Sequence, residues 1–296
     1  MSRQGEFAQI SQNEDGTRVA VWGIFKLHSA FQPIFAFNSD GRLEIMAFEC
    51  LIRPFREGAA VPPHRFFSSV PPEERVEVET LMRNLHLLNA GTFIDPSALI
   101  FVNFDPSQFA KTENIEAALR GMRLVLHEAN IDRSRIVCEL TEQKSASPLA
   151  LKNLMMALRN HGFRIAVDDF GAEDSDFDRI IQMNPDIVKF DAEWVIKLLR
   201  SAAGYTLLKS MITKVTERGI QTVIEGVEEP WQLELSEKAG ALMVQGFGIA
   251  RPQIAPSEFA IRAAPVPTVP RFPVFQETAE LTAAPGGPQS VFGRRS

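Results

Sequence analysis

Short apolar runs alternate with longer helix-like segments along most of the chain. The helix-like segments are Arg75–Asn89, Asn114–Ala129, Ser147–His161 and Trp194–Arg218. The apolar runs, many rich in β-branched residues, are Ile45–Phe48, Leu99–Val102, Ile136–Cys138, Phe163–Val167, Ile187–Val188, Gln221–Ile224 and Leu242–Val244. Short, fully apolar strands that alternate with helices predict a largely parallel sheet whose faces are covered.

The number of these units predicts how the sheet closes. About seven or eight units over about 240 residues fit a closed, TIM-like (β/α)8 barrel better than two dinucleotide-binding halves. No GxGxxG motif follows the first strand, which counts further against dinucleotide binding. We therefore expect an α/β barrel over residues 25–264. Residues 1–24 are expected to form a short lead-in, and residues 265–296, rich in proline and glycine, a flexible tail.

Each of the seven apolar runs ends in a polar side chain that can bind a metal or a phosphate. These are Glu49, Asn103, Glu139, Asp168 with Asp169, Lys189 with Asp191 two residues on, Glu225 and Gln245. One carboxylate at a strand end means little, because strands end where polar residues begin. In a parallel barrel, however, the C-terminal strand ends meet at one mouth, where such enzymes hold their active sites. The pattern therefore gathers carboxylates, amides and a lysine around one cavity.

A cluster of this kind needs compensating positive charge. Ionised carboxylates in a partly dehydrated site repel one another, so protons or cations must balance them. Oxygen ligands with one amide suit Mg2+ or Mn2+, with Ca2+ as a competitor, whereas the five scattered histidines argue against zinc. The carboxylates suffice for two metals about 3.5 to 4 Å apart, an arrangement suited to in-line displacement at phosphorus. With Lys189 to orient water or stabilise the transition state, the residues predict a metallohydrolase acting on a phosphate ester.

The composition limits which cellular compartment and which binding partners we expect. Hydrophobic residues make up 45% and charged residues 23%, as in a soluble globular protein. The net charge of −6 disfavours a protein that holds DNA by its phosphates. Cys50 and Cys138 stand in apolar runs, which indicates buried thiols in a reducing compartment. Without a signal peptide or a membrane-spanning run, we expect a cytoplasmic protein that does not bind membranes.

The same strand ends resemble the motifs of the EAL-domain family of cyclic di-GMP-specific phosphodiesterases. Residues 49–53 read ECLIR, similar to the family's ExLxR signature with cysteine in place of the usual alanine. Gln32-Pro33-Ile34 resembles the QPI of the family's first strand. The remaining motifs are VNxxP around Asn103, ELTE from Glu139, DDFG from Asp168, KxD from Lys189, EGVE from Glu225 and QGF from Gln245 with Pro252. Each motif is weak alone, but their complete order along the chain is specific.

The resemblance implies a TIM-like barrel whose first strand is antiparallel to the others. It also implies hydrolysis of cyclic di-GMP to linear pGpG by in-line attack of a metal-activated water. Two Mg2+ or Mn2+ ions, with Ca2+ as an inhibitory competitor, would be held by Glu49, Asn103, Glu139, Asp168, Asp169 and Glu225. The catalytic residues it implies are Glu49, Lys189 and Glu225. Those implied to bind substrate are Gln32, Leu51, Arg53, Asp191 and Gln245, with Leu51 beside a guanine and Arg53 on a phosphate, while Glu142 would brace the loop after Asp169.

The loop after this DDFG motif departs from the family pattern. Residues 172–177 read AEDSDF, where the family usually has a small residue, glycine, an aromatic and two serines. Glu173 stands in place of a glycine and makes a left-handed conformation costlier. The added acids allow two interpretations. They are solvated residues on the loop surface, or they alter the conformation or regulation of the loop, so that the enzyme has low activity or altered coupling between the subunits of a dimer.

Three other functions fit parts of the sequence. A catalytically weak or inactive cyclic di-GMP receptor that signals through a protein partner keeps the fold, but it would be expected to lose metal ligands or the lysine. A protein kinase, prompted by Asp169-Phe170-Gly171, lacks the preceding glycine-rich loop and catalytic loop. A scaffold with vestigial ligand binding is supported by the proline-rich tail. EAL-like domains often pair beside the DDFG loop, so we expect a homodimer, with control by a protein partner, by dimerisation or by expression.

Overall fold

The structure is a computed structural model. It describes residues 9–259 except 39, 110–111, 142–147, 172–176, 178–179, 181–182 and 258. The strands are β1 (Gln9–Gln12), β2 (Arg18–Trp22), β3 (Phe25–Phe37), β4 (Leu43–Arg56), β5 (Ala59–Ala60), β6 (Leu99–Phe104), β7 (Ile136–Thr141), β8 (Arg164–Phe170), β9 (Ile187–Phe190), β10 (Gln221–Ile224), β11 (Met243–Val244) and β12 (Gln253–Ile254). The α-helices are α1 (Pro63–Ser69), α2 (Arg75–Phe93), α3 (Thr112–Glu128), α4 (Pro148–Asn160), α6 (Ala192–Leu199), α7 (Ala202–Thr216) and α8 (Pro230–Ala239), and the short 3-10 helices are η1 (Pro72–Glu74), η2 (Pro106–Phe109) and η3 (Arg133–Arg135).

Eight of the strands close into a barrel. Its order is β3, β11, β10, β9, β8, β7, β6 and β4, and pairing of β4 with β3 completes the ring. The seven strands β4, β6, β7, β8, β9, β10 and β11 are parallel to one another along this ring. In contrast, β3 is antiparallel to both β4 and β11. The TIM-like barrel with an antiparallel first strand is therefore confirmed.

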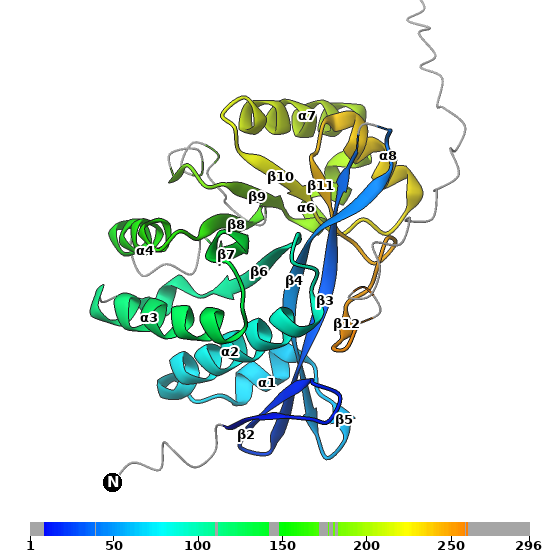
Figure 1. Cartoon of the computed structure of the whole chain (residues 1–296). Coiled ribbons are helices and arrows are strands. Elements are labelled where there is room, and N and C mark those ends of the chain that lie inside the picture. The colour runs from blue at the N-terminus through cyan, green and yellow to red at the C-terminus, as the bar shows by residue number, and fades with distance from the viewer. Residues whose placement is uncertain are drawn as a thin grey trace, which may run out of the picture.

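The two strands that open the barrel are its longest, with 13 residues in β3 and 14 in β4. Their outer ends form a ribbon, to which β2 and β5 pair beside Phe25 and Phe55 (Figure 1). Because β1 pairs with β2, residues 9–22 form a hairpin that joins the barrel through β3. This hairpin lies within residues 1–24, the segment expected to be a lead-in.

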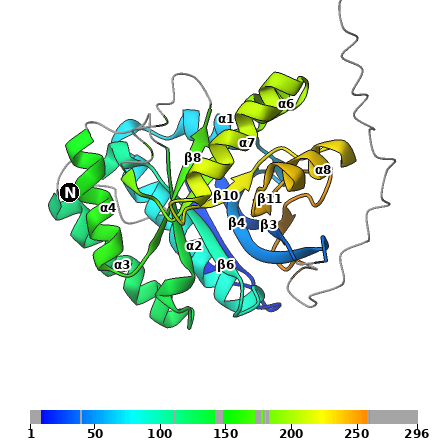
Figure 2. The same cartoon turned by 90° about the horizontal axis from the view of Figure 1, so that it is seen from above.

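The helices lie outside the strands (Figure 2). Helices α2, α3 and α4 confirm the segments predicted from Arg75, Asn114 and Ser147. The single helix predicted over Trp194–Arg218 is wrong, because α6 ends at Leu199 and α7 begins at Ala202. The Ser201 hydroxyl accepts a hydrogen bond from the Gly204 N–H at 3.0 Å. A serine in this N-cap position starts a new helix, so two helices replace one.

The inside of the barrel is filled by a set of apolar side chains, one from each barrel strand. This apolar plug consists of Ile34, Ala47, Phe101, Val137, Ala166, Ile187, Val223 and Met243. None is more than 1% exposed. Successive side chains of a strand point to opposite faces, so residues two positions from the plug also face the barrel interior.

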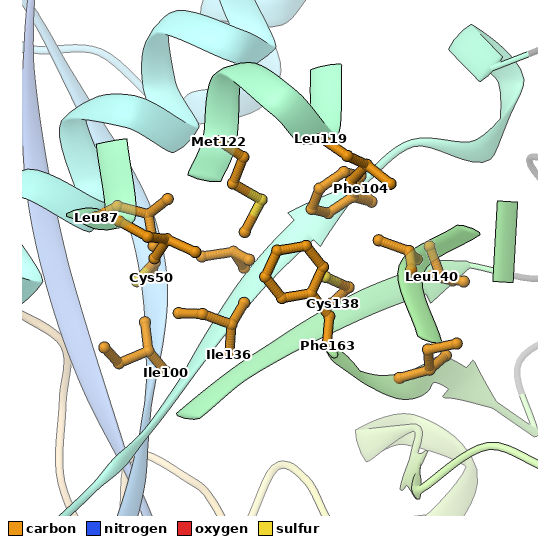
Figure 3. Packing of buried hydrophobic residues seen from close by; sticks show 14 of the residues in the cluster. Cys50, Leu87, Ile100, Phe104, Leu119, Met122, Ile136, Cys138, Leu140 and Phe163 are labelled. Atoms are coloured by element: carbon orange, nitrogen blue, oxygen red, sulfur yellow. The ribbon is translucent and has the colours of Figure 1, made fainter. Parts of the chain in front are cut away.

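A larger apolar cluster lies between the strands and the helices outside them. Figure 3 shows part of it, with Cys50 of β4 and Cys138 of β7 among leucine, isoleucine, methionine and phenylalanine side chains. Both cysteines are free and buried, as expected from the sequence. Burial raises the pKa of both thiols above its ordinary value, so these residues pack as small apolar groups. Within the described part of the chain, no helix combines the length and the apolar character needed to cross a bilayer.

Candidate active site

Polar residues replace the apolar plug two positions further toward the C-terminal ends of the parallel strands. These mouth residues are Gln32, Glu49, Asn103, Glu139, Asp168, Lys189, Glu225 and Gln245. On the antiparallel β3 the step runs backwards along the chain, from Ile34 to Gln32, which is paired with Glu49 of β4. The barrel therefore presents carboxylates, amides and a single lysine at its mouth, each from a different strand or strand end.

Lys189 lies at the centre of the mouth residues and is 1% exposed. Its Nζ is 2.6 Å from Glu139 Oε1, 2.7 Å from Glu225 Oε1, 3.0 Å from Asp168 Oδ1 and 3.9 Å from Glu49 Oε2. Gln245 Nε2 donates a hydrogen bond to Glu49 Oε2 at 2.7 Å. The structure thus brings together six of the residues predicted from separate strand ends.

A bulge in β8 allows the carboxylates of two consecutive residues, Asp168 and Asp169, both to lie near Glu225. The pairing register between β8 and β9 shifts between Val167 and Phe170, and Asp169 has a left-handed φ of 58°. In a regular strand, Asp168 and Asp169 would point to opposite faces, and a bulge redirects one of them. One carboxylate oxygen each from Asp168, Asp169 and Glu225 lies within 4.8 Å of the other two.

Burial and mutual repulsion govern the ionisation of these groups. Burial raises the pKa of Glu139 well above its ordinary value, with Glu49 and Asp168 adding to the rise against the opposing charge of Lys189. Burial likewise raises the pKa of Glu225 to about 8, despite Lys189. Burial alone would lower the pKa of Lys189, but the four carboxylates, led by Asp168, raise it well above its usual range. Lys189 therefore stays protonated, but its single positive charge does not balance the negative charge that all four carboxylates can carry.

The donor set fits a hard divalent cation. Lys189 is the one cation among the mouth residues and faces four carboxylates, with Asp169 as a fifth acid beside them. Glu139 Oε2 is buried and has no hydrogen-bond partner in the described part of the chain. Because unpaired buried carboxylate oxygens are costly, such a site gains from added positive charge. Carboxylate and amide oxygens are the ligands that Mg2+, Mn2+ and Ca2+ favour.

The two loops that follow β10 and β11 hold Glu225 and Gln245 in place. Gln245 N donates to Ile224 O at 2.9 Å, and Val227 N donates to Gln245 O at 3.1 Å. At Gly246 a Cβ atom would lie 2.0 Å from Val227 O, which only glycine avoids. The glycine of the QGF motif thus permits the close backbone approach that sets Gln245 beside Glu49.

A cavity of ≈ 510 Å³ adjoins the mouth residues between β4, β6 and α2. Leu51 and Arg53, predicted to contact substrate, line it together with the mouth residue Asn103. Two further arginines, Arg75 and Arg83 of α2, also line it. Three arginines against the two acids Glu79 and Asp105 give the cavity lining a small excess of positive charge, and the cavity meets the acidic mouth at Asn103.

Two predicted site residues form hydrogen bonds with groups other than Lys189 and its carboxylates. The mouth residue Gln32 is the register partner of Glu49, and its Nε2 donates to Ala250 O at 3.3 Å, which ties β3 to the segment before β12. Asp191 is the N-cap of α6 and accepts from Trp194 N at 2.8 Å. Its assigned contact with substrate stays a prediction. Glu142 and residues 172–176 of the acidic loop lie outside the described residues, so their predicted roles are not tested.

Sequence reasoning missed the polar residues that α2 adds to the cavity. Glu79, Arg83 and His86 all line it. They lie within Arg75–Asn89, a segment predicted to be a helix from the spacing of its apolar residues. The signal that could have revealed them is their spacing, since residues three or four apart share one face of a helix.

The fold and the site together define a barrel protein with a carboxylate-rich candidate metal site at its mouth. The EAL domain family matches residues 25–252, and the chain belongs to this family. It is 33% identical over 265 residues to the cyclic di-GMP phosphodiesterase RocR of Pseudomonas aeruginosa, covering 85% of this chain and 63% of RocR. It is 27% identical over 226 residues to the cyclic di-GMP phosphodiesterase PdeH of Escherichia coli, covering 75% of this chain and 82% of PdeH.

Solved structures share the fold. A Klebsiella pneumoniae BlrP1 complex with calcium and cyclic di-GMP matches with a TM-score of 0.65 and 24% identity, over 77% of this chain and 56% of that one. The Bacillus subtilis YkuI protein, solved with cyclic di-GMP and calcium, matches with a TM-score of 0.66 at 24% identity, over 77% of this chain and 56% of that one. The chain thus spans little more than half the length of these two proteins.

Proposed function

We propose that this chain is a metal-dependent phosphodiesterase that hydrolyses cyclic di-GMP to linear pGpG. The observation that carries the proposal is the set of mouth residues, in which every predicted ligand from the described strands is present and four carboxylates surround Lys189. The names of RocR and PdeH, both cyclic di-GMP phosphodiesterases, support the choice of substrate. The basic cavity beside the mouth offers space for part of an anionic ligand.

The proposed reaction breaks one phosphodiester bond. A water oxygen forms a bond to phosphorus as the bond to the ribose 3′ oxygen breaks in line with it, and the leaving oxygen takes a proton. Glu49, Asn103, Glu139, Asp168, Asp169 and Glu225 would hold Mg2+ or Mn2+, two ions per site. When bound, these ions supply Lewis acidity and neutralise charge that develops on the phosphoryl oxygens.

The remaining residues would bind the substrate and orient the attacking water and the Glu49 side chain. Lys189, held by Glu139 and Glu225, would orient the attacking water or stabilise charge on a phosphoryl oxygen. Gln245 fixes the rotamer of Glu49 through their 2.7 Å hydrogen bond. Arg53 offers the planar fork that binds a phosphate through two hydrogen bonds. Ca2+ would compete for the site without supporting turnover.

Substitutions at the mouth test these roles. We expect Asp168→Ala to abolish hydrolysis and to weaken Mn2+ binding, because it removes a metal ligand. We expect Lys189→Ala to retain Mn2+ and cyclic di-GMP binding while turnover falls about 100-fold or more, in the range found when a stabilising donor is removed. Product formation by chromatography, with calorimetry for Mn2+ and for cyclic di-GMP in Ca2+, measures these quantities separately.

Glu234→Ala provides the matched control, since Glu234 pairs with Lys238 on the outer helix α8. It should hydrolyse cyclic di-GMP at the wild-type rate. Wild-type turnover by Lys189→Ala would contradict the role assigned to Lys189. A wild-type chain that binds cyclic di-GMP tightly without cleaving it would favour the receptor alternative instead.

A homodimer and a regulatory protein partner remain part of the proposal. The acidic loop of residues 172–177 is the segment that would couple dimerisation to activity. Light scattering over a range of concentrations, combined with activity at each, tests this coupling. A fully active monomer at high concentration would contradict it.

A further inference from the structure

Helix α2 buries a stripe of polar residues against the barrel. Arg83 is 5% exposed, His86 is 7% exposed and Asn89 is fully buried. A helix that covers a sheet normally turns apolar residues inward. A buried arginine is costly unless its partners repay the lost hydration, so its presence points to a specific task.

The contacts of Arg83 lead to one place, the end of β6. Its Nη1 donates to the backbone carbonyl of Asn103 at 3.4 Å. Its guanidinium carbon lies 4.1 Å from the ring centroid of Phe104, close enough for a cation–π interaction. Glu79, one turn earlier on α2, adds a favourable charge. Arg83 therefore ties the last residues of β6 to α2.

Asn103 is the mouth residue that most needs this support. Its register partner on β7 is Glu139, so both side chains point to the same face of the sheet, toward the mouth. The Asn103 side chain is exposed and, within the described part of the chain, has no hydrogen-bond partner. The direction of that side chain consequently depends on the backbone that carries it, which is the backbone that Arg83 holds.

We propose that Arg83 is a positioning residue that holds the end of β6 so that the Asn103 amide is directed at the metal centre. The inference rests on the proposed function, in which Asn103 is a metal ligand. Arg83 acts through the Asn103 carbonyl and the Phe104 ring and does not itself touch metal. Groups of this kind orient metal ligands, and their loss typically weakens metal binding about 10- to 100-fold.

Arg135 offers a matched control at the opposite end of the same strand. Its Nε donates to Ala98 O at 2.9 Å, directly before β6 begins. Arg83 and Arg135 thus both bond the backbone at an end of β6, but only the end held by Arg83 carries a mouth residue. Replacing each by methionine keeps most of the side-chain volume and removes the hydrogen bond.

The test is the Mn2+ dissociation constant of the full chain, measured by calorimetry without cyclic di-GMP. We expect Arg83→Met to bind Mn2+ about 10- to 100-fold more weakly, Arg83→Lys to recover part of the loss, and Arg135→Met to bind as wild type does. Arg83→Met should add no further loss in the Asn103→Ala background, because there is then no ligand to orient. Thermal unfolding and circular dichroism accompany each variant, and Arg83→Lys keeps the test open if Arg83→Met does not fold.

Wild-type Mn2+ affinity in Arg83→Met would overturn the inference, and so would wild-type affinity in Asn103→Ala. A loss confined to cyclic di-GMP affinity, measured in Ca2+, would make Arg83 a substrate contact and would overturn it as well. Failure of the proposed function is distinguishable. A wild-type chain that does not hydrolyse cyclic di-GMP, but whose Mn2+ affinity depends on Asn103 and on Arg83 as described, would retain this inference alone.

Discussion

Lys189 is the residue on which the charge balance of the mouth depends. Three carboxylates lie within 3.0 Å of its Nζ, and Glu49 lies at 3.9 Å. A buried lysine would ordinarily lose its proton, but this ring of acids keeps it charged. It therefore acts as a fixed internal cation that leaves enough negative charge for divalent metals to be attracted.

The buried histidine His86 leads to a prediction of how the stability of the fold depends on pH. Its Nδ1 lies 2.9 Å from Ser29 Oγ, and burial, followed by the charges of Arg53 and Arg83, lowers its pKa from 6.5 to about 3. The unfolded chain takes up a proton at this histidine below pH 6.5, whereas the folded chain does not until about pH 3. His86 therefore reduces stability as the pH falls through this window.

We expect the difference in unfolding free energy between wild type and His86→Gln to become smaller as the pH falls. Their difference in unfolding free energy should shrink by up to about 1.4 kcal/mol for each pH unit below 6.5. Urea unfolding at pH 7.5, 6.5 and 5.5 measures it, with His64→Gln, an exposed position on α1, as the control. A gap that stays constant over this range would contradict a neutral, buried His86.

At the residue scale, the sequence predicted most of the mouth. Glu49, Glu139, Asp168, Lys189 and Glu225 follow apolar runs, and that position carries the inference. The expectation that the strand ends at Glu49 is wrong, because β4 continues to Arg56 to pair with β3 and β5. Gln32 could not be found this way, because its strand is antiparallel and the polar residue stands within an apolar run. Arg83 and His86 were missed as well, since a polar residue in a helical pattern is ordinarily assigned to solvent, and only their spacing on one helix face could have indicated otherwise.

At the scale of elements, one asparagine of α2 links the hairpin of β1 and β2 to the barrel, in addition to the pairing of β2 with β3. Asn89 Oδ1 accepts from Arg18 N at 2.7 Å, and its Nδ2 donates to Arg18 O at 2.9 Å and to Ser29 Oγ at 3.0 Å. A single side chain thus satisfies both backbone groups of the first residue of β2. This side chain also links the hairpin to β3.

Replacing Asn89 should loosen the hairpin. We expect Asn89→Ala to lower the free energy of unfolding by about 1–3 kcal/mol, because buried polar groups lose their partners. Hydrogen exchange at the amides of β2 should quicken, while exchange within β7 should change little. Asn13→Ala, which removes a bond within the hairpin turn itself, is the comparison. Unchanged exchange in β2 of Asn89→Ala would show that other contacts hold the hairpin.

Some elements could be predicted from the sequence and others could not. Strands β6 to β10 and helices α2 to α4 follow from apolar runs and helical spacing. The length of β3 and β4 escaped prediction because their outer ends alternate polar and apolar residues in a two-sided ribbon. The break between α6 and α7 depends on the cap at Ser201, a local signal within an otherwise helical pattern.

At the scale of the whole molecule, an acidic mouth and a basic cavity lie side by side at one end of the barrel. They meet at Asn103, which lies on the wall of the cavity and is also a mouth residue. In the proposed function, an anionic ligand held at the mouth would extend into the cavity toward Arg53. The fold class was predictable because strand–helix alternation is repeated along the chain, whereas the cavity wall depends on tertiary packing.

The central claim is that the mouth residues hydrolyse cyclic di-GMP with a divalent metal. The most direct measurement is the product formed by the purified chain from cyclic di-GMP, with Mg2+ or Mn2+ and with EDTA. The account predicts linear pGpG with either metal and no product with EDTA. Intact cyclic di-GMP under every condition, together with tight binding of the dinucleotide, would contradict it.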